Sequence, residues 1–314
     1  MTDIPPSCVY FKSPCPVPVA ARERARALGA FAALASFEEI AISPKPGLVD
    51  PTDSGSHDDM TWVTFIMSAS ALAPFWSEQA MDGIIHGHYK PSDGLHVKLR
   101  ARGTAMERKM FEATGGVNTH RGLVYVLSIL LGASGMCAEA GDSSPERICA
   151  VAASIAAPLA EEDFGRARAK ASAGEELTHG ERIFIEHGIG GVRHEAASGF
   201  PSALSALAEL ESALGLGASL PDASLSALLL LMLEAEDTNI IHRSGVGFWR
   251  GEYRERTLYA RKNFDPMRPG GYEPLLDLNG FLTARGASPG GAADLLVCTL
   301  FLYRSKILDN INAT

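Results

Sequence analysis

GLVYVLSILLGASGMCA, residues 122–138, is a long apolar stretch of the chain without a charged side chain. It is shorter than the ~20 apolar residues that a membrane-spanning helix needs, and serine and glycine residues interrupt it. A second stretch, PDASLSALLLLMLEAE at residues 221–236, repeats its leucines and methionine at the i, i+3, i+4, i+7 spacing of one helical face. Helices that are apolar on most faces belong at the centre of a globule. Both stretches therefore predict buried core helices.

Helical periodicity continues outward from these two stretches along most of the chain. Good helix formers fill the segments between glycines and prolines, and no convincing alternating β-branched run predicts a strand. We expect helices at residues 20–41, 59–73, 75–88, 94–113, 118–138, 145–158, 161–171, 175–187, 192–214, 221–236, 251–263, 272–286 and 290–309. The sequence predicts one all-α globular domain of about a dozen helices at residues 20–314, with a flexible proline-rich tail at residues 1–19.

The composition excludes several classes of protein. The 314 residues are 46% hydrophobic and 21% charged, which excludes a mainly disordered chain. A net charge of −9 argues against a general nucleic-acid binder, although a local basic pocket for a nucleotide stays open. Five cysteines, an odd number, do not suggest a disulfide scaffold. The N-terminus lacks the apolar core of a secretion signal, so we expect a cytoplasmic protein with reduced thiols and no membrane partner.

The polar residues concentrate in the turns between these helices. Turns that join packed helices are where binding and catalytic groups are usually mounted. Five such segments combine glycine or proline with His, Asp, Glu, Asn, Lys or Arg: SPKPGLVDPTDSGSHDDM (43–60), MFEATGGVNTHRG (110–122), HGIGGVRHEAASGFPS (187–202), EDTNIIHRSG (236–245) and SPGGAADLL (288–296).

The first segment predicts a functional cluster. Flanking prolines predict an extended, exposed backbone around Lys45, whose ammonium can donate to phosphate oxygens. Asp58 and Asp59 lie where helix 59–73 is expected to start, so helix capping explains one of them. Several carboxylates beside His57 exceed what capping needs, which favours a functional role.

Structural explanations compete with function in the later segments too. A helix C-cap followed by an N-cap explains the glycines before Asn118. It does not explain His120 and Arg121, which lie at the start of the next helix. Because the start of a helix attracts phosphate, these two residues favour a phosphate-binding role. At Arg193, a solvent-exposed surface turn explains the residue as well as a functional role does. Asp237 can be a cap, although its polar neighbours suggest a lined pocket. No phosphate-binding loop, zinc motif or serine-hydrolase motif occurs elsewhere in the sequence.

Together and in this order, the five segments resemble the triphosphoribosyl-dephospho-CoA synthase family, from around Leu28 to around Tyr303. The resemblance implies an all-α enzyme that serves citrate lyase or malonate decarboxylase. Its substrates would be ATP and 3′-dephospho-CoA, and its products 2′-(5″-triphosphoribosyl)-3′-dephospho-CoA and adenine. The former is the precursor of a prosthetic group that a phosphoribosyl-dephospho-CoA transferase, an expected partner, attaches to an acyl carrier protein.

The resemblance also implies a set of site residues. The set is Lys45, Asp50, His57, Asp59, Glu107, Thr114, Asn118, Thr119, His120, Arg193, Glu195, Asp237, Asn239, His242, Arg243 and Asp294, and Arg121 is added to it as a second-motif residue that differs from the family.

We expect these residues to support an inverting displacement at C1′ of the ATP ribose, through an oxocarbenium-like transition state. Glu107 is the expected general base, with Asp50 as the second choice and His57 as the third catalytic residue. Asp59 and Asp237 are the expected carboxylates for Mg²⁺ on the triphosphate. The expected phosphate-binding cations are Lys45, Arg121, Arg193 and Arg243, with His120 nearby.

Four positions depart from the family pattern. Arg121 stands where the family usually has Lys, His194 where it has Gly, Thr61 where an acid is common, and Asp53 where Asn is common. Because of these departures, the identity of the acceptor alcohol stays open, and an alcohol other than dephospho-CoA is an alternative. The same residues could also belong to a hydrolase that cleaves the N-glycosidic bond with water, or to a non-catalytic carrier of CoA derivatives.

Overall fold

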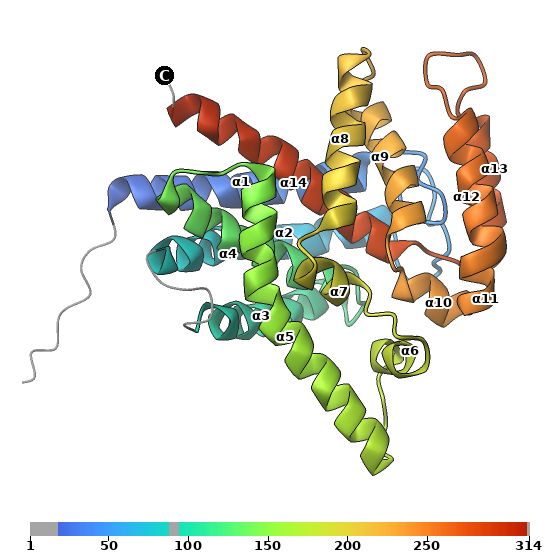
Figure 1. The fold of residues 1–314 in the computed structure, drawn as a ribbon. Coiled ribbons are helices and arrows are strands. Elements are labelled where there is room, and N and C mark those ends of the chain that lie inside the picture. The colour runs from blue at the N-terminus through green and yellow to red at the C-terminus, as the bar shows by residue number, and fades with distance from the viewer. Residues whose placement is uncertain (1–17, 88–93, 313–314) are drawn as a thin grey trace, which may run out of the picture.

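The structure, a computed structural model, describes residues 18–87 and 94–312 and contains only helices in those ranges, as predicted (Figure 1). Of the predicted tail, residues 1–17 lie outside the described residues, and the first helix begins at Val19. The elements are α1 (Val19–Ala41), α2 (Trp62–His86), α3 (Leu95–Thr114), α4 (Arg121–Ala140), α5 (Pro145–Ala173), α6 (His179–His187), α7 (Val192–Ala197), α8 (Pro201–Gly215), α9 (Leu220–Glu234), α10 (Thr238–Ser244), α11 (Val246–Phe248), a π-helical turn η1 (Trp249–Tyr253), α12 (Arg254–Asn263), α13 (Glu273–Thr283) and α14 (Gly290–Asn312).

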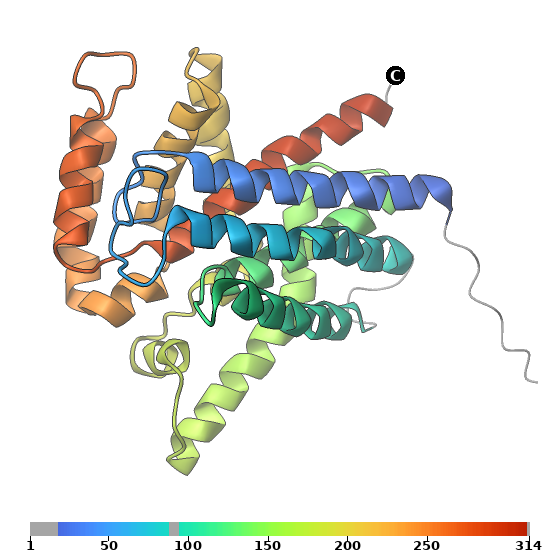
Figure 2. The same cartoon turned by 180° about the vertical axis from the view of Figure 1, so that it is seen from behind.

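Helix α4 lies at the centre of the fold. Helices α1, α2 and α3 lie side by side across one face (Figure 2), and α4 contacts each of them as well as α5, α7 and α14. Its residues from Leu123 to Cys137 are nearly all buried. Among the described residues α4 is the one helix long and apolar enough to cross a membrane, and 78% of its most apolar window is buried inside the fold. The prediction of a buried core helix here is confirmed.

Small residues let α2 and α4 pack backbone against backbone. A Cβ atom added to Gly83 would lie 2.0 Å from the carbonyl oxygen of Gly132, and one added to Gly135 would lie 2.2 Å from that of Ala80. No larger side chain fits at these positions without moving a helix. This close approach holds the C-terminal half of α4 against α2.

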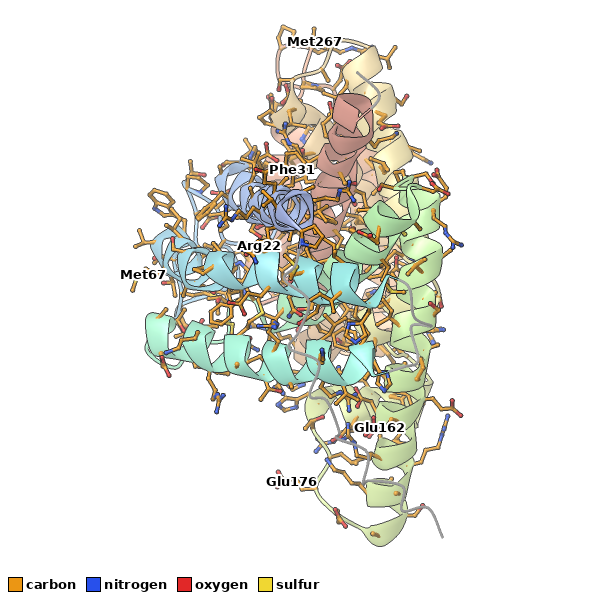
Figure 3. The ribbon with its side chains drawn as sticks, turned by 90° about the vertical axis from the view of Figure 1, so that its left-hand side faces the viewer. Arg22, Phe31, Met67, Glu162, Glu176 and Met267 are labelled. Atoms are coloured by element: carbon orange, nitrogen blue, oxygen red, sulfur yellow. The ribbon has the colours of Figure 1, made fainter. Side chains whose placement is uncertain are left out.

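The connecting segments gather at one end of the helical body. The loop at residues 42–61, the short helices α10 and α11, and the N-terminus of α14 lie close together in both views. Helix α5 projects past α3 as an arm, on which Glu162 is labelled in Figure 3, and Glu176 lies in the loop after its end. Helix α6 packs against this arm and contacts α10, so the arm forms one wall beside the gathered loops.

Several predicted helix boundaries are wrong. The two helices predicted at residues 59–73 and 75–88 are one helix, α2 (Trp62–His86), with Pro74 inside it. The two predicted at residues 145–158 and 161–171 are one helix, α5, with Pro158 inside it. A proline removes one backbone hydrogen bond but does not end a helix whose apolar face stays packed. Residues 192–214 are two helices, because Phe200 adopts a left-handed backbone conformation (φ 56°).

The capping explanation for Asp58 and Asp59 is also wrong. Helix α2 begins at Trp62, and Thr61 is its N-cap residue. The backbone N–H of Thr61 donates to Oγ1 of Thr64 at 3.1 Å, which closes this end of the helix. Both aspartates precede the cap and are exposed.

Candidate functional site

The interhelical turns and the arm of α5 enclose a cavity of about 750 Å³. Its wall includes the N-terminal ends of α4, α6, α10 and α14, whose backbone N–H groups carry partial positive charge. Of the predicted residues, those that line the cavity are His57, Asp59, Glu107, Asn118, Thr119, His120, Arg121, Arg193, Asn239, Arg243 and Asp294. The tertiary structure thus brings segments 43–60, 110–122, 187–202, 236–245 and 288–296 to one site.

One corner of the cavity is built around His57. Its Nε2 lies 2.9 Å from Oγ of Ser288, and its Nδ1 lies 3.4 Å from an Arg243 guanidinium nitrogen and 3.6 Å from a carboxylate oxygen of Asp59. Burial, and next the charge of Arg243, lower the pKa of His57 below its usual value. His57 is therefore neutral at pH 7, and Arg243 supplies the positive charge in this corner.

A second group of residues lies at the junction of α3 and α4. Nε of Arg121 and a carboxylate oxygen of Glu107 are 3.2 Å apart, and the Glu107 side chain is 30% exposed to the cavity. The amide oxygen of Asn118 accepts the backbone N–H of Arg121 at 3.3 Å. A carboxylate, a guanidinium and an amide thus face the same space.

His120 lies at the floor of the cavity, at the start of α4. Its Nδ1 is 2.6 Å from Oγ of Ser68, which accepts a hydrogen bond from Thr119 at 2.7 Å. Burial, and next the charge of Lys45, lower the pKa of His120 to about 3, so the ring is neutral. Its Nε2 is buried and has no partner among the residues that the structure describes. That nitrogen remains available for a ligand.

Two carboxylates organise the helix starts at the back of the cavity. Asp237 accepts backbone N–H groups from Asn239 at the start of α10 and from Gly291 at the start of α14, both at 2.9 Å. Burial raises the pKa of Asp237 to about 6 despite these bonds. Asp294 approaches α4 so closely that a Cβ on Gly122 would lie 2.0 Å from its carboxylate oxygen. Burial, and next the charge of Asp237, raise the pKa of Asp294 well above its usual value.

The expectation of an exposed backbone around Lys45 is wrong. Lys45 is 2% exposed and does not line the cavity. Its Nζ donates to a carboxylate oxygen of Glu39 at 2.6 Å and to the carbonyl oxygen of the same residue at 2.8 Å. The loop folds back over the end of α1, and burial of the lysine requires this acidic partner.

Asp50 also lies outside the cavity wall. Its two carboxylate oxygens accept the backbone N–H groups of Lys45, Thr52 and Asp53 at 2.7–2.9 Å, and the hydroxyls of Ser43 and Thr52. Burial raises the pKa of Asp50, but these bonds outweigh burial and the net shift is downward. Its bonds hold the turn together, which does not fit the predicted role of a second-choice general base.

Three further predicted residues are held away from the cavity wall. Glu195 caps α8, where its carboxylate accepts the N–H of Ser202 at 2.8 Å. Thr114 donates to the carbonyl oxygen of Val117 at 2.6 Å and closes the turn after α3. His242 stacks on His179, which does line the cavity, with ring centroids 3.6 Å apart. The free backbone groups at helix ends need hydrogen-bond partners. A sequence alone therefore does not show whether a polar residue near a helix end caps the helix or binds a substrate.

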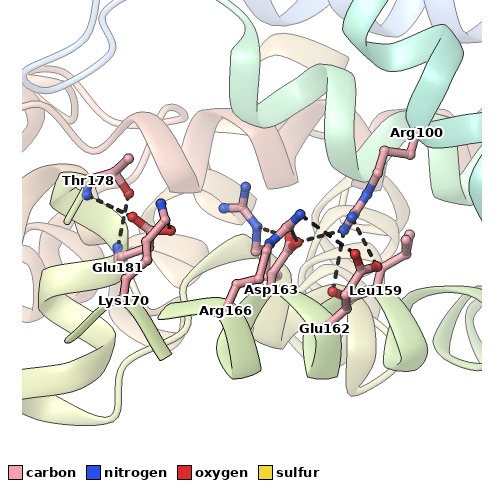
Figure 4. Close-up of polar contacts among 9 residues, drawn as sticks. Arg100, Leu159, Glu162, Asp163, Arg166, Lys170, Thr178 and Glu181 are labelled. Atoms are coloured by element: carbon pink, nitrogen blue, oxygen red, sulfur yellow. Dashed lines mark hydrogen bonds and ion pairs between the residues drawn. The ribbon is translucent and has the colours of Figure 1, made fainter. Parts of the chain in front are cut away.

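Sequence reasoning missed a cluster on α5. Asp163 contacts Arg100 of α3, Arg166 of α5 and Arg193 of α7, and all four line the cavity (Figure 4). In the sequence, Asp163 and Arg166 form an ordinary i, i+3 pair of the kind found on solvated helix faces. Only the crossing of α3 over α5 reveals the cluster.

The fold and the site together define an all-α enzyme whose interhelical turns form a cationic and acidic cavity. Residues 25–312 match the model of the ATP:dephospho-CoA triphosphoribosyl transferase family. The chain belongs to this family of transferases, whose name gives ATP and dephospho-CoA as its substrates. The resemblance carried by the five segments is thereby confirmed.

Curated relatives agree with this assignment. The chain is 38% identical to a protein of Streptococcus equi subsp. equi, over 84% of this chain and 91% of that protein. It is 34% identical to a protein of Streptococcus mutans, over 89% and 96%, and 36% identical to one of Streptococcus pyogenes, over 86% and 94%. Each is named a probable 2-(5″-triphosphoribosyl)-3′-dephosphocoenzyme-A synthase. No solved structure matches the chain.

Proposed function

We propose that this chain transfers the triphosphoribosyl group of ATP to the 2′-hydroxyl of 3′-dephospho-CoA and releases adenine. Family membership and the names of the relatives support this reaction. The observation that carries it in the structure is one cavity of about 750 Å³ that presents a carboxylate, Glu107, together with guanidinium groups from several helices. A displacement between two polyphosphate substrates needs both kinds of group.

The proposed chemical step breaks one bond and forms another at C1′ of the ATP ribose. Glu107 accepts the proton of the acceptor 2′-hydroxyl, whose oxygen then bonds to C1′. The C1′–N9 bond breaks, and adenine leaves with the bonding electrons and takes up a proton. Positive charge develops on the ribose in the transition state, so carboxylates on the cavity wall, such as Glu107 and Asp59, stabilise it.

Guanidinium groups hold the triphosphate, which the reaction leaves intact. Arg121 and Arg243 line the cavity and are the proposed triphosphate-binding residues, whereas Arg193, which also lines it, is proposed to bind phosphate of the acceptor. Lys45 is left out because its ammonium is buried against Glu39. The Nε2 of His120, which has no partner among the described residues, supplies a neutral contact at the floor.

The residues present fit Mg²⁺ that arrives with ATP. Asp59 lines the cavity with a side chain that is 56% exposed, and its carboxylate would hold Mg²⁺ there. Asp237 does not fit, because its oxygens already accept backbone N–H groups of two helices. Among the described residues no group of three or more ligating side chains surrounds a metal position. Mg²⁺ on a nucleotide takes one or two carboxylates beside phosphate and water oxygens, and would neutralise part of the triphosphate charge.

The proposed reaction also indicates the compartment of the protein and its partner enzyme. We place the protein in the cytoplasm, where ATP is abundant; the free, buried thiols of Cys149 and Cys298 fit a reducing compartment. The triphosphoribosyl product needs a second enzyme, a phosphoribosyl-dephospho-CoA transferase, to attach it to an acyl carrier protein.

Mass spectrometry of a reaction with ATP, Mg²⁺ and dephospho-CoA tests the proposal. We expect adenine and the joined product in equal amounts. Adenine released from ATP alone at the same rate would identify a hydrolase instead. Tight binding of dephospho-CoA without adenine release would identify a carrier. A joined product with another alcohol, but not with dephospho-CoA, would identify a different acceptor.

A further inference from the structure

The cluster around Asp163 is a second basic region of the cavity, built from helices α3, α5 and α7. Nη2 of Arg100 lies 2.7 Å from one carboxylate oxygen of Asp163, and Nε of Arg193 lies 2.9 Å from the other. Arg166 contacts the same carboxylate. Figure 4 shows the guanidinium groups of Arg100 and Arg166 beside Asp163. Guanidinium groups from three helices thus share one carboxylate at the cavity wall.

The charges in this cluster do not balance. Three guanidinium groups carry about fifteen N–H donors, whereas one carboxylate offers about four acceptor sites. Glu162 also contacts Arg100 at 3.1 Å and Arg166 at 3.6 Å, but it is 56% exposed and outside the cavity wall. Positive charge and unused donors therefore remain on the cavity side, and an anion with several oxygens can use them.

Tyr125 of α4 adds a neutral wall to the same region. The Arg193 guanidinium lies 5.3 Å from the centroid of its ring, which fixes the direction of that side chain. The phenolic oxygen is buried and has no hydrogen-bond partner among the described residues. Burial raises the pKa of Tyr125 to about 12, so this hydroxyl keeps its proton at neutral pH. A donor is thus available beside the arginines.

We propose that Arg100, Arg166 and Arg193 form a polyphosphate subsite that binds the diphosphate of the acceptor, dephospho-CoA. The subsite lacks a free carboxylate for Mg²⁺, because Asp163 is shared among the arginines. It therefore suits a diphosphate that arrives without a metal ion. The corner of His57 and Arg243 contains the exposed carboxylate of Asp59 and suits the magnesium complex of ATP.

This inference rests on the proposed function only for the identity of the ligand. The chemistry, recognition of a di- or triphosphate ester by guanidinium groups, is common to both substrates. Separate binding measurements with dephospho-CoA and with ATP show which of the two substrates the subsite binds, and they need no turnover.

Calorimetry of the Arg166→Gln and Arg100→Gln variants tests the subsite. The Arg166 side chain is 56% exposed, so its replacement leaves the core intact. Hydrogen bonds to charged groups predict about tenfold weaker binding, or more, for dephospho-CoA in Mg²⁺-free buffer. We expect less than a twofold change for ATP with Mg²⁺. Arg166→Lys should recover part of the affinity because it keeps the charge but not the planar group.

Arg102→Gln is the matched control. Arg102 lies two positions from Arg100 on α3 and is likewise paired with acids, Glu78 and Asp82, but it does not line the cavity. We expect unchanged affinity for both substrates in this variant. Thermal unfolding of every variant separates loss of the subsite from loss of the fold.

Three outcomes distinguish this inference from the proposed function. Unchanged dephospho-CoA affinity in both variants overturns the subsite, even if adenine and the joined product still form. A loss confined to ATP overturns the assignment to the acceptor. Weaker dephospho-CoA binding in a protein that never releases adenine supports the subsite and refutes the proposed transferase reaction.

Discussion

Replacement of Lys45 by methionine should destabilise the fold strongly, because Lys45 and Glu39 form a buried ion pair. Their side chains are 2% and 5% exposed, and Nζ lies 2.6 Å from the carboxylate oxygen. Removing one partner of a buried pair leaves the other charge without compensation and costs about 3–5 kcal/mol. For a chain of this size such a loss lowers the melting temperature by on the order of 10 °C.

Urea denaturation of four proteins measures this coupling: the natural chain, Lys45→Met, Glu39→Leu and the double variant. Replacing both charges by apolar groups of similar volume is often neutral, so we expect the double variant to recover most of the lost stability. ATP calorimetry on the same proteins tests the role first predicted for Lys45. We expect the double variant to bind ATP as the natural chain does.

A cost of less than about 1 kcal/mol for Lys45→Met, which is the range of exposed ion pairs, would refute the strong coupling of this buried pair. A double variant that is no more stable than the single variants would refute it as well. A stable double variant with much weaker ATP binding would return Lys45 to the phosphate-binding residues.

Four further predictions concern the cavity. Glu107→Gln should lower turnover by about 10²–10⁴-fold while calorimetry shows ATP binding roughly unchanged; near-normal turnover would remove Glu107 as the base. Arg243→Gln should raise the pKa of His57, measured by NMR titration, because the charge of Arg243 helps to lower it. Since His57 in the fold binds protons less readily than in the unfolded chain, its contribution should reduce stability as the pH falls below 6.5. Asp59→Asn should increase the Mg²⁺ concentration for half-maximal rate several-fold, and an unchanged requirement would exclude Asp59 as a magnesium ligand.

Much of the candidate site was predictable because it lies in turns. His57 in the first loop, and Arg121 and Arg243 near the ends of short connections, all line the cavity. Polar residues beside glycines or prolines between apolar helices have few structural reasons to be there, which is why the pattern indicates a site. The same pattern misled at Glu195, because a helix start needs an acceptor as much as a substrate needs a ligand.

The sequence by itself determined that the chain is helical, that α4 is buried and which turns carry polar groups, because helical periodicity and turn residues are local properties. Only the tertiary structure decided which groups meet. Pairing of Lys45 with Glu39 depends on a loop folding back on α1, and the meeting of Arg100 with Asp163 depends on the crossing of two helices. Such contacts arise from the packing of whole helices, and no spacing along the chain encodes them.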